Sequence, residues 1–184
     1  MKFIKTAIPS VFIIEPSVFG DDRGYFLESY NKKAFQENIG SVNFVQDNES
    51  RSSKGVLRGL HFQKPPYTQA KLVRCIKGEV LDVAVDIRKG SPTYGKHVAV
   101  ILTGENKRQL FVPRGFAHGF AVLSETAIFA YKVDNTYAPE HDAGIKYDDK
   151  ELNIDWGITE EEIQLSEKDK NLSFFKDLDS PFKF

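Results

Sequence analysis

The stretch AKLVRCIKGEVLDVAVDI, residues 70–87, decides the fold. It holds two apolar, β-branched runs separated by Lys77-Gly78, and such runs across a very short turn predict the two strands of a hairpin. Side chains alternate between the two faces of a strand, so Asp82 and Asp86 share one face of the second run. That face is directed either to solvent or to the interior of a barrel.

Strand patterns of the same kind recur along the whole chain. They are short, rich in β-branched or aromatic residues, and separated by Gly, Pro, Asn or Asp: VFIIEP, YFLESY, VNFVQD, GVLRGLHFQ, KHVAVILT, RQLFVP and FAVLSETAIFAYKV. The last of these predicts a second hairpin, with its turn around Ser124-Glu125. Many short strands at regular spacing predict an all-β sandwich or barrel. No linker divides the chain, so we expect one domain over residues 1–184.

Helical patterns are few. NKKAFQENIG predicts a short helix with Asn31 as its N-cap and Gly40 as its stop, and TEEEIQ offers a threonine cap followed by acidic residues. The C-terminal sequence SEKDKNLSFFKDLDSPFKF predicts an irregular arm that docks through its aromatic side chains.

The composition is that of a globular protein, with 41% hydrophobic and 28% charged residues among 184. The apolar run HVAVIL is far too short to span a membrane, and the N-terminus lacks the pattern of a secretion signal, so we expect a cytoplasmic protein without membrane contact. A formal charge of −1 argues against nucleic-acid binding but allows an anionic small molecule. The single cysteine, Cys75, is predicted to be a small buried hydrophobe.

The stretch GVLRGLHFQ combines a buried-strand pattern with Arg58 and His61. Burying such groups is costly unless they are paired or used. Three positions apart on a regular strand, they would point to opposite faces, and a bulge at Gly59 would bring them together. His61 is therefore either a proton acceptor or a satisfied core histidine, and the same two readings apply to His118 in VPRGFAHGF.

No metal or cofactor site is expected. Four histidines are present, but their spacing does not match a metal-ligand pattern, and His97 and His141 are predicted to be structural or surface residues. Glycine-rich phosphate loops are absent, so side chains would have to hold a nucleotide. The cationic candidates are Arg23, Arg58, Lys71 and Arg114.

Over residues 4–170 the chain resembles the dTDP-4-dehydrorhamnose 3,5-epimerase family. The ordered motifs that carry the resemblance are FGDDRGYFLESY, FVQDNES, SSKGVLRGLHFQ, KLVRCIKGEVLDVAVDIRKGSPTYGK, NKRQLFVPRGFAHGFAVLSETAIFAYKVDNTYAPEHDAGIKYDD, NIDW and LSEKD. The resemblance implies a cupin-like β-jelly roll, a metal-free site without a cofactor, and a homodimer that shares active-site residues across its interface. It also implies a role in dTDP-L-rhamnose biosynthesis, which supplies lipopolysaccharide or O-antigen.

The implied reaction inverts C3 and C5 of dTDP-4-dehydro-6-deoxy-D-glucose to give dTDP-4-dehydro-β-L-rhamnose. Inversion needs a base, an acid on the opposite face and a group that stabilises the enolate between them. By resemblance, His61 is the base and Asp169 its partner. Tyr131 is the proton donor, and Lys71 lies near the C4 oxygen.

The resemblance also assigns substrate-binding positions, of which Arg23 and Glu28 reach across the dimer interface. They are Arg23, Glu28, Gln46, Asp47, Asn48, Arg58, His118, Asp142 and Lys168. Two departures affect this set: Thr136-Tyr137 replaces two adjacent tyrosines, and Asp142 stands where a longer glutamate is expected. Both would loosen nucleotide or sugar contacts without touching the base or the acid.

Three other functions fit parts of the pattern. A relative that inverts a single centre would need a disabled or displaced acid, and Tyr131 is present. A ketoisomerase acting on a related dTDP-sugar shares the cupin shell, but RGLHFQ with AYKV favours the epimerase. A non-catalytic sugar-binding cupin would not require His61, Tyr131 and Asp169 together.

Overall fold

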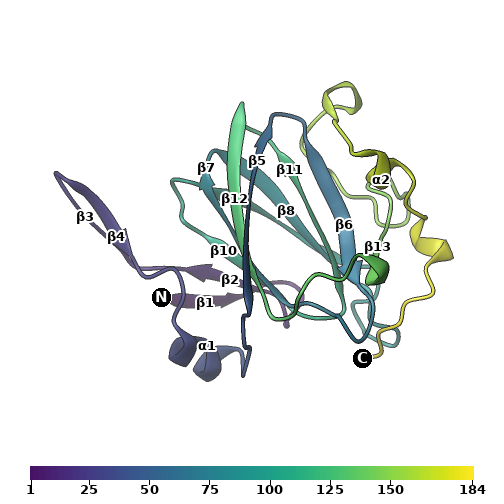
Figure 1. The fold of residues 1–184 in the computed structure, drawn as a ribbon, viewed down its shortest axis with the longest axis horizontal. Helices are drawn as coiled ribbons and strands as arrows, with labels where there is room; N and C mark the ends of the chain where they lie inside the picture. Colours follow the sequence, from purple (N-terminus) through teal and green to yellow (C-terminus); the bar gives the residue numbers. More distant parts are fainter.

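Two antiparallel sheets lie face to face in the computed structural model, which describes residues 1–184 (Figure 1). The six-stranded sheet has the order β1 (Lys2–Lys5), β2 (Phe12–Glu15), β10 (Gln109–Val112), β7 (Lys71–Lys77), β12 (Thr126–Val133) and β5 (Gln46–Ser53). The five-stranded sheet has the order β13 (Asp142–Gly144), β6 (Leu57–Gln63), β11 (Phe116–Val122), β8 (Glu79–Asp86) and β9 (His97–Thr103). The all-β sandwich predicted from the sequence is confirmed.

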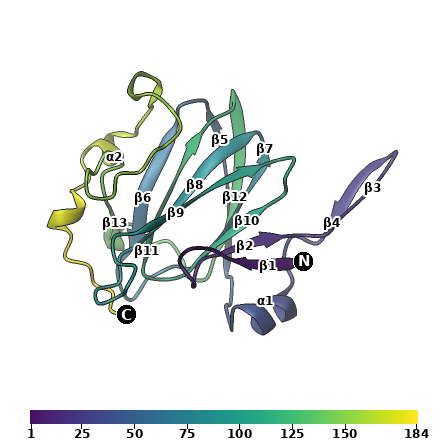
Figure 2. The same cartoon turned by 180° about the vertical axis from the view of Figure 1, so that it is seen from behind.

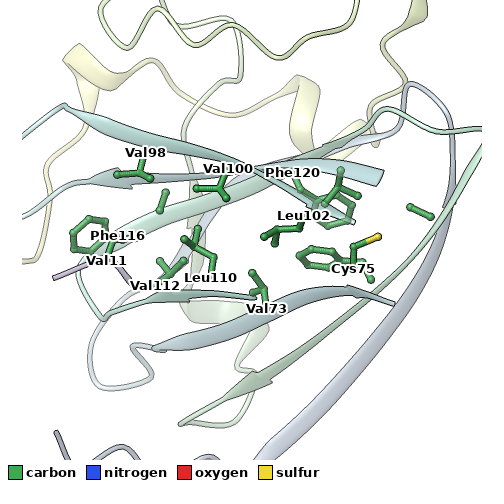
Figure 3. Packing of buried hydrophobic residues seen from close by; sticks show 14 of the residues in the cluster. Val11, Val73, Cys75, Val98, Val100, Leu102, Leu110, Val112, Phe116 and Phe120 are labelled. Carbon is green, nitrogen blue, oxygen red and sulfur yellow. The ribbon is translucent and has the colours of Figure 1, made fainter. Parts of the chain in front are cut away.

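The main core fills the space between the sheets. Figure 3 shows Val73 and Leu110 of the six-stranded sheet facing Val100 and Phe120 of the five-stranded sheet. Burying each such side chain contributes roughly 1.5–3 kcal/mol, so this cluster of 16 residues drives the two sheets together. Cys75 belongs to the same cluster and is buried, as predicted.

A second apolar cluster covers the outer face of the five-stranded sheet. Val83 and Val85 of β8 pack there against Trp156 and Phe175 of the C-terminal segment, residues 145–184, which runs along this sheet in Figures 1 and 2. Strand β8 is therefore buried on both faces, and Asp82, which shares the other face, lies inside the sandwich with no exposed surface. The barrel-interior alternative for the two aspartates is the correct one.

The C-terminal segment is irregular, as predicted, but only some of its aromatic residues dock. Phe175 is buried and Phe182 packs against the same cluster, whereas Phe184 is exposed. The segment holds the 3₁₀ turns η2 (Glu160–Glu162) and η3 (Phe175–Asp177) and the one-turn helix α2 (Glu167–Lys170), whereas the 3₁₀ turn η1 (Pro139–His141) precedes β13. The predicted cap of η2 is present, because Thr159 and Glu162 form a capping box.

Both predicted hairpins are wrong. Strand β7 pairs with β10 and β12 while β8 pairs with β11 and β9, so the turn at Gly78 carries the chain from one sheet to the other. The turn at Ser124 does the same between β11 and β12. The two corners contact each other: Glu79 N donates to Ser124 Oγ at 2.9 Å, and a Cβ on Gly78 would meet Thr126 O at 2.2 Å. The strands that these turns join to the six-stranded sheet, β8 and β11, are buried along nearly their whole length.

Strand β5 also differs from its prediction. The strand begins at Gln46, after most of VNFVQD, and runs through polar residues to Ser53. It is an edge strand that pairs only with β12, and its alternate side chains face solvent, so polar residues are tolerated there.

The N-terminal part carries two further elements. The predicted helix is α1 (Lys32–Asn38), where the Asn31 side chain accepts from Ala34 N and Gly40 follows with φ of 123°. The hairpin of β3 (Val18–Asp21) and β4 (Gly24–Leu27) projects from the body of the molecule (Figures 1 and 2). Phe19 and Phe26 on it are 65% and 69% exposed.

None of the helices has the length and apolar character needed to cross a membrane.

Candidate active site

A cavity of about 530 Å³ lies beside the main core, between the two sheets and the C-terminal segment. Phe120 and Phe129, stacked with ring centroids 4.2 Å apart, form part of its apolar lining. Its polar and ionisable lining includes Arg58, His61, Lys71, His118, Tyr131, Lys168 and Asp169. All four predicted catalytic residues and three of the predicted substrate-binding residues thus meet in one place.

A bulge in β6 gives the cavity two of these side chains. His61 pairs with His118 and Arg58 pairs with Phe120, so β6 has one residue more than β11 between the same two pairs. Gly59 lies in the bulge with φ of 127°, and a Cβ on it would meet Gly119 Cα at 2.5 Å. The bulge predicted at Gly59 is confirmed, and it lets Arg58 and His61 line the same cavity.

His61 and Asp169 form a hydrogen-bonded pair, in which His61 Nε2 donates to Asp169 Oδ1. Ser166, the N-cap of α2, donates its hydroxyl to Asp169 Oδ2 at 2.9 Å and accepts from Asp169 N at 3.1 Å. Burial opposes the negative charge, yet the hydrogen bonds from His61 and Ser166 keep the pKa of Asp169 below its ordinary value. Because Nε2 carries the proton, Nδ1 of His61 holds the lone pair that can take another.

Tyr131 approaches the cavity from the opposite sheet. It lies on β12, packs against the main core and lines the cavity that His61 borders from β6. Burial raises the pKa of the Tyr131 phenol, and the positive charge of Arg58 opposes that rise. The phenol is therefore protonated at neutral pH and can donate a proton.

Lys71 is the cation nearest the interior of the site. Its side chain shares the inward face of β7 with Val73, which belongs to the core. Burial lowers the pKa of Lys71 to about 8, although the charges of Asp82 and Asp142 act to raise it. Lys71 is thus mainly an ammonium at pH 7 and can stabilise negative charge on an oxygen in the cavity.

His118 has a carboxylate partner of its own. Its Nε2 lies 3.0 Å from both oxygens of Asp82. Burial is the main cause that lowers the pKa of His118, and Asp82 opposes it. His118 is therefore neutral at pH 7, with Nε2 as the donor and Nδ1 as an acceptor.

An adjoining cavity of about 340 Å³ shares His61, Lys71, Tyr131 and Lys168 with the first. It also contains the predicted substrate-binding residues Gln46, Asn48 and Asp142. One of the two departures from the family pattern, Asp142, lies here: Tyr137 donates its hydroxyl to Asp142 at 3.1 Å, and Lys168 forms an ion pair with the same carboxylate. The shorter Asp142 thus reaches both neighbours.

Three predicted substrate-binding residues lie away from these cavities in the single chain. Arg23 is 90% exposed on the β3–β4 hairpin and pairs with Asp21 at 2.6 Å. Glu28 is exposed and accepts from Asn31. Asp47 borders a neighbouring hollow, which Asn48 and Tyr131 also line, and accepts from Lys132 at 2.8 Å. Their role in binding stays a prediction.

Sequence reasoning missed the residues that hold the site residues in place. Asp82 binds His118, Ser166 binds Asp169, and Ser52 accepts from Arg58 at 3.3 Å. Two signals were available: the alternation that put Asp82 on an apolar face, and a serine three positions before Asp169, as in a helix cap. No group of three or more His, Cys, Asp or Glu side chains is placed to hold a metal ion.

The chain is similar over its full length to known proteins of one kind. The family model described as dTDP-4-dehydrorhamnose 3,5-epimerase matches residues 5–177. The enzyme of that name from Shigella flexneri is 58% identical over 180 residues, covering 97% of this chain and 98% of that protein.

Solved structures agree. The dTDP-6-deoxy-D-glucose-3,5-epimerase of Legionella pneumophila, in complex with dTDP-4-keto-L-rhamnose, is 52% identical with a TM-score of 0.96, over 100% of this chain and 98% of that one. A 3′-monoepimerase from Streptomyces bikiniensis shares the fold at 30% identity and a TM-score of 0.86, over 93% of this chain and 86% of that one. The sandwich is thus the cupin-like fold of these enzymes, and the chain belongs to the dTDP-4-dehydrorhamnose 3,5-epimerase family.

Proposed function

We propose that this chain is a dTDP-4-dehydrorhamnose 3,5-epimerase, which converts dTDP-4-dehydro-6-deoxy-D-glucose to dTDP-4-dehydro-β-L-rhamnose. One observation supports the mechanism above all others. His61 and Tyr131 border one cavity from opposing sheets, so a sugar ring held between them would meet a base on one face and an acid on the other. Inversion at carbon requires that arrangement.

The chemistry follows from the C4 ketone of the substrate, which acidifies the hydrogens on C3 and C5. Nδ1 of His61 takes one of these protons, and the electron pair of the broken C–H bond moves into an enolate whose oxygen lies against the Lys71 ammonium. The Asp169 carboxylate stabilises the imidazolium that results.

Tyr131 completes each inversion. Its phenol gives a proton to the opposite face of the same carbon, which forms the new C–H bond and collapses the enolate to the ketone. His61 then carries an extra proton and Tyr131 lacks one, and exchange with water restores both. The sugar is neither oxidised nor reduced, so the residues need no redox partner.

Binding of the nucleotide part is assigned to the polar residues around the two cavities. Arg58 and Lys168 supply positive charge for the diphosphate, and Asn48 and Gln46 supply amides. In the free chain Asp142 pairs with Lys168, so diphosphate binding would have to compete for that ammonium.

The active form is proposed to be a homodimer in which the β3–β4 hairpin reaches the partner. Phe19, Tyr25 and Phe26 on this projecting hairpin are exposed, and a second copy would cover them. Arg23 and Glu28 would then contribute to the partner's cavity.

Complementation between variants tests this arrangement. His61→Ala and Arg23→Ala would each be inactive or impaired alone, but a mixed dimer has one site with both residues intact if Arg23 acts across the interface. Co-refolding equal amounts should restore about a quarter of wild-type activity, since half of the dimers are mixed and each has one intact site. No restoration would place Arg23 in its own chain's site.

The decisive experiment follows the substrate by NMR in deuterated water with the purified protein. We expect deuterium at both C3 and C5 and inverted configuration at both carbons. Label and inversion at C3 alone would identify a 3′-monoepimerase instead. Migration of the ketone would identify a ketoisomerase, and binding without label would identify a sugar-binding protein.

A further inference from the structure

Asp82 is a buried carboxylate with no assigned role. It has no exposed surface, its neighbours Val80 and Ala84 on the same face of β8 belong to the apolar core, and its only hydrogen-bond partner is His118. Resting on the proposed function, we propose that Asp82 is a positioning residue of the epimerisation, which orients His118 and supplies the buried negative charge that balances the Lys71 ammonium.

Asp82 has fewer hydrogen-bond donors for its buried negative charge than Asp86 has. Asp86 lies on the same face of the same strand, is equally buried, and accepts hydrogen bonds from the Arg88 guanidinium, Ser91 and Thr93. Asp82 accepts only from one neutral imidazole. A buried carboxylate costs several kcal/mol unless a charge or several donors compensate it, so a cation on the facing sheet is the missing compensation.

Lys71 is that cation. It lies on β7 in the six-stranded sheet and points inward, while Asp82 points inward from β8 in the five-stranded sheet. Two negative charges raise the pKa of Lys71, and the charge of Asp82 has a larger effect than the charge of Asp142. Asp142 is already paired with Lys168, which leaves Asp82 as the carboxylate available to balance Lys71.

The hydrogen bonds of Asp82 also fix the state of His118. Two carboxylate oxygens at 3.0 Å from Nε2 hold the ring in the Nε2–H tautomer and leave Nδ1 as an acceptor for a sugar hydroxyl. Removing the carboxylate would free the ring to rotate and to change tautomer. Asp82 thus acts on the substrate through two residues that line the cavity, without lining it itself.

The Asp82→Asn variant separates charge from hydrogen bonding, because asparagine keeps an oxygen that can accept from His118. We expect kcat to fall about tenfold with KM little changed, since the enolate bears its charge in the transition state. We also expect the alkaline limb of the pH–rate profile to move to lower pH, because Lys71 loses its counter-charge. The other ionisable groups around this pair stay in place: Arg58, His61, His118, Tyr131, Asp142, Lys168 and Asp169.

Asp86→Asn is the matched control. It removes a carboxylate of equal burial from the same face of β8, outside the cavity, so we expect a lower Tm with an unmoved alkaline limb. A folded Asp82→Asn enzyme with wild-type kcat and an unmoved limb would refute the proposal, as would an equal shift in both variants.

A measurement on the wild-type protein keeps the proposal testable if Asp82→Asn does not fold. Nitrogen-15 NMR of the imidazoles should show His118 as the Nε2–H tautomer between pH 6 and pH 8, about the range in which an unconstrained imidazole titrates. The Nδ1–H tautomer, or an imidazolium, would overturn it. This readout needs no turnover, so it stays informative even if the substrate assay rejects the proposed function.

Discussion

His61 and Asp169 are hydrogen bonded although 108 positions separate them in the sequence. The imidazole belongs to a central part of the sandwich, whereas the carboxylate belongs to a one-turn helix in the C-terminal segment. The proposed base is therefore assembled only when that segment lies against the five-stranded sheet.

Replacing His61 by alanine should stop proton removal at both carbons. A positioned general base contributes about 10²- to 10⁴-fold, so exchange of the C3 and C5 hydrogens with deuterated water should fall by at least that order while dTDP binding is retained. Calorimetry with dTDP is the control for binding. Wild-type exchange in this variant would remove His61 from the mechanism.

Replacing Tyr131 by phenylalanine should separate inversion from exchange. The phenol delivers a proton in the proposed mechanism, so its loss should slow inversion more than it slows deuterium uptake, and NMR measures both in one sample. Because phenylalanine fills nearly the same space, the Tm should change little. An equal loss of inversion and exchange would contradict the assignment of the acid.

Gly59→Ala should disturb the bulge that carries Arg58 and His61. An added Cβ would meet the Gly119 backbone at 2.5 Å, so the variant should lose both stability and activity. Gly90→Ala is the matched control, because Gly90 also has a positive φ but a Cβ there meets nothing within 4 Å. Strain at a positive φ costs on the order of 1 kcal/mol, and Gly59→Ala should cost clearly more. Similar Tm values for the two variants would argue against close packing at Gly59.

Asp86 should make the free energy of unfolding fall at acidic pH. Burial opposes its charge, but hydrogen bonds from Arg88, Ser91 and Thr93 lower its pKa to about 2 from an ordinary 3.8. A carboxyl with a depressed pKa stabilises the fold fully above the unfolded-state pKa, and this contribution of about 2 kcal/mol is lost as the pH falls through about 2. Urea unfolding between pH 6 and pH 2 should show this loss in the wild type and less of it in Asp86→Asn.

Local patterns were sufficient to predict most of the strands, the α1 helix with its Asn31 cap, and the bulge at Gly59, but they misplaced the polar edge strand β5. They failed where the partner of a strand mattered, at Gly78 and Ser124, because a short turn between apolar runs looks alike whether the runs pair with each other or enter different sheets. Burial on both faces of β8 indicates that the two runs enter different sheets.

The site itself was predicted by resemblance more than by periodicity. The sequence left His61 equally consistent with catalysis and with a core role, and only the motifs that contain Tyr131 and Asp169 favoured catalysis. The contact between Asp82 and His118 could not be predicted, since it depends on the register between β8 and β11. Such register is set by the packing of whole sheets rather than by nearby residues.

The apolar contacts between β8 and the C-terminal segment have a consequence for how the enzyme would lose activity. Trp156 and Phe175 hold the segment that carries Asp169. Segments of a protein open with free energies of their own, below that of global unfolding. Opening of this segment alone would separate Asp169 from His61, so heat or proteolysis that acts there would inactivate the protein while the two sheets were still intact.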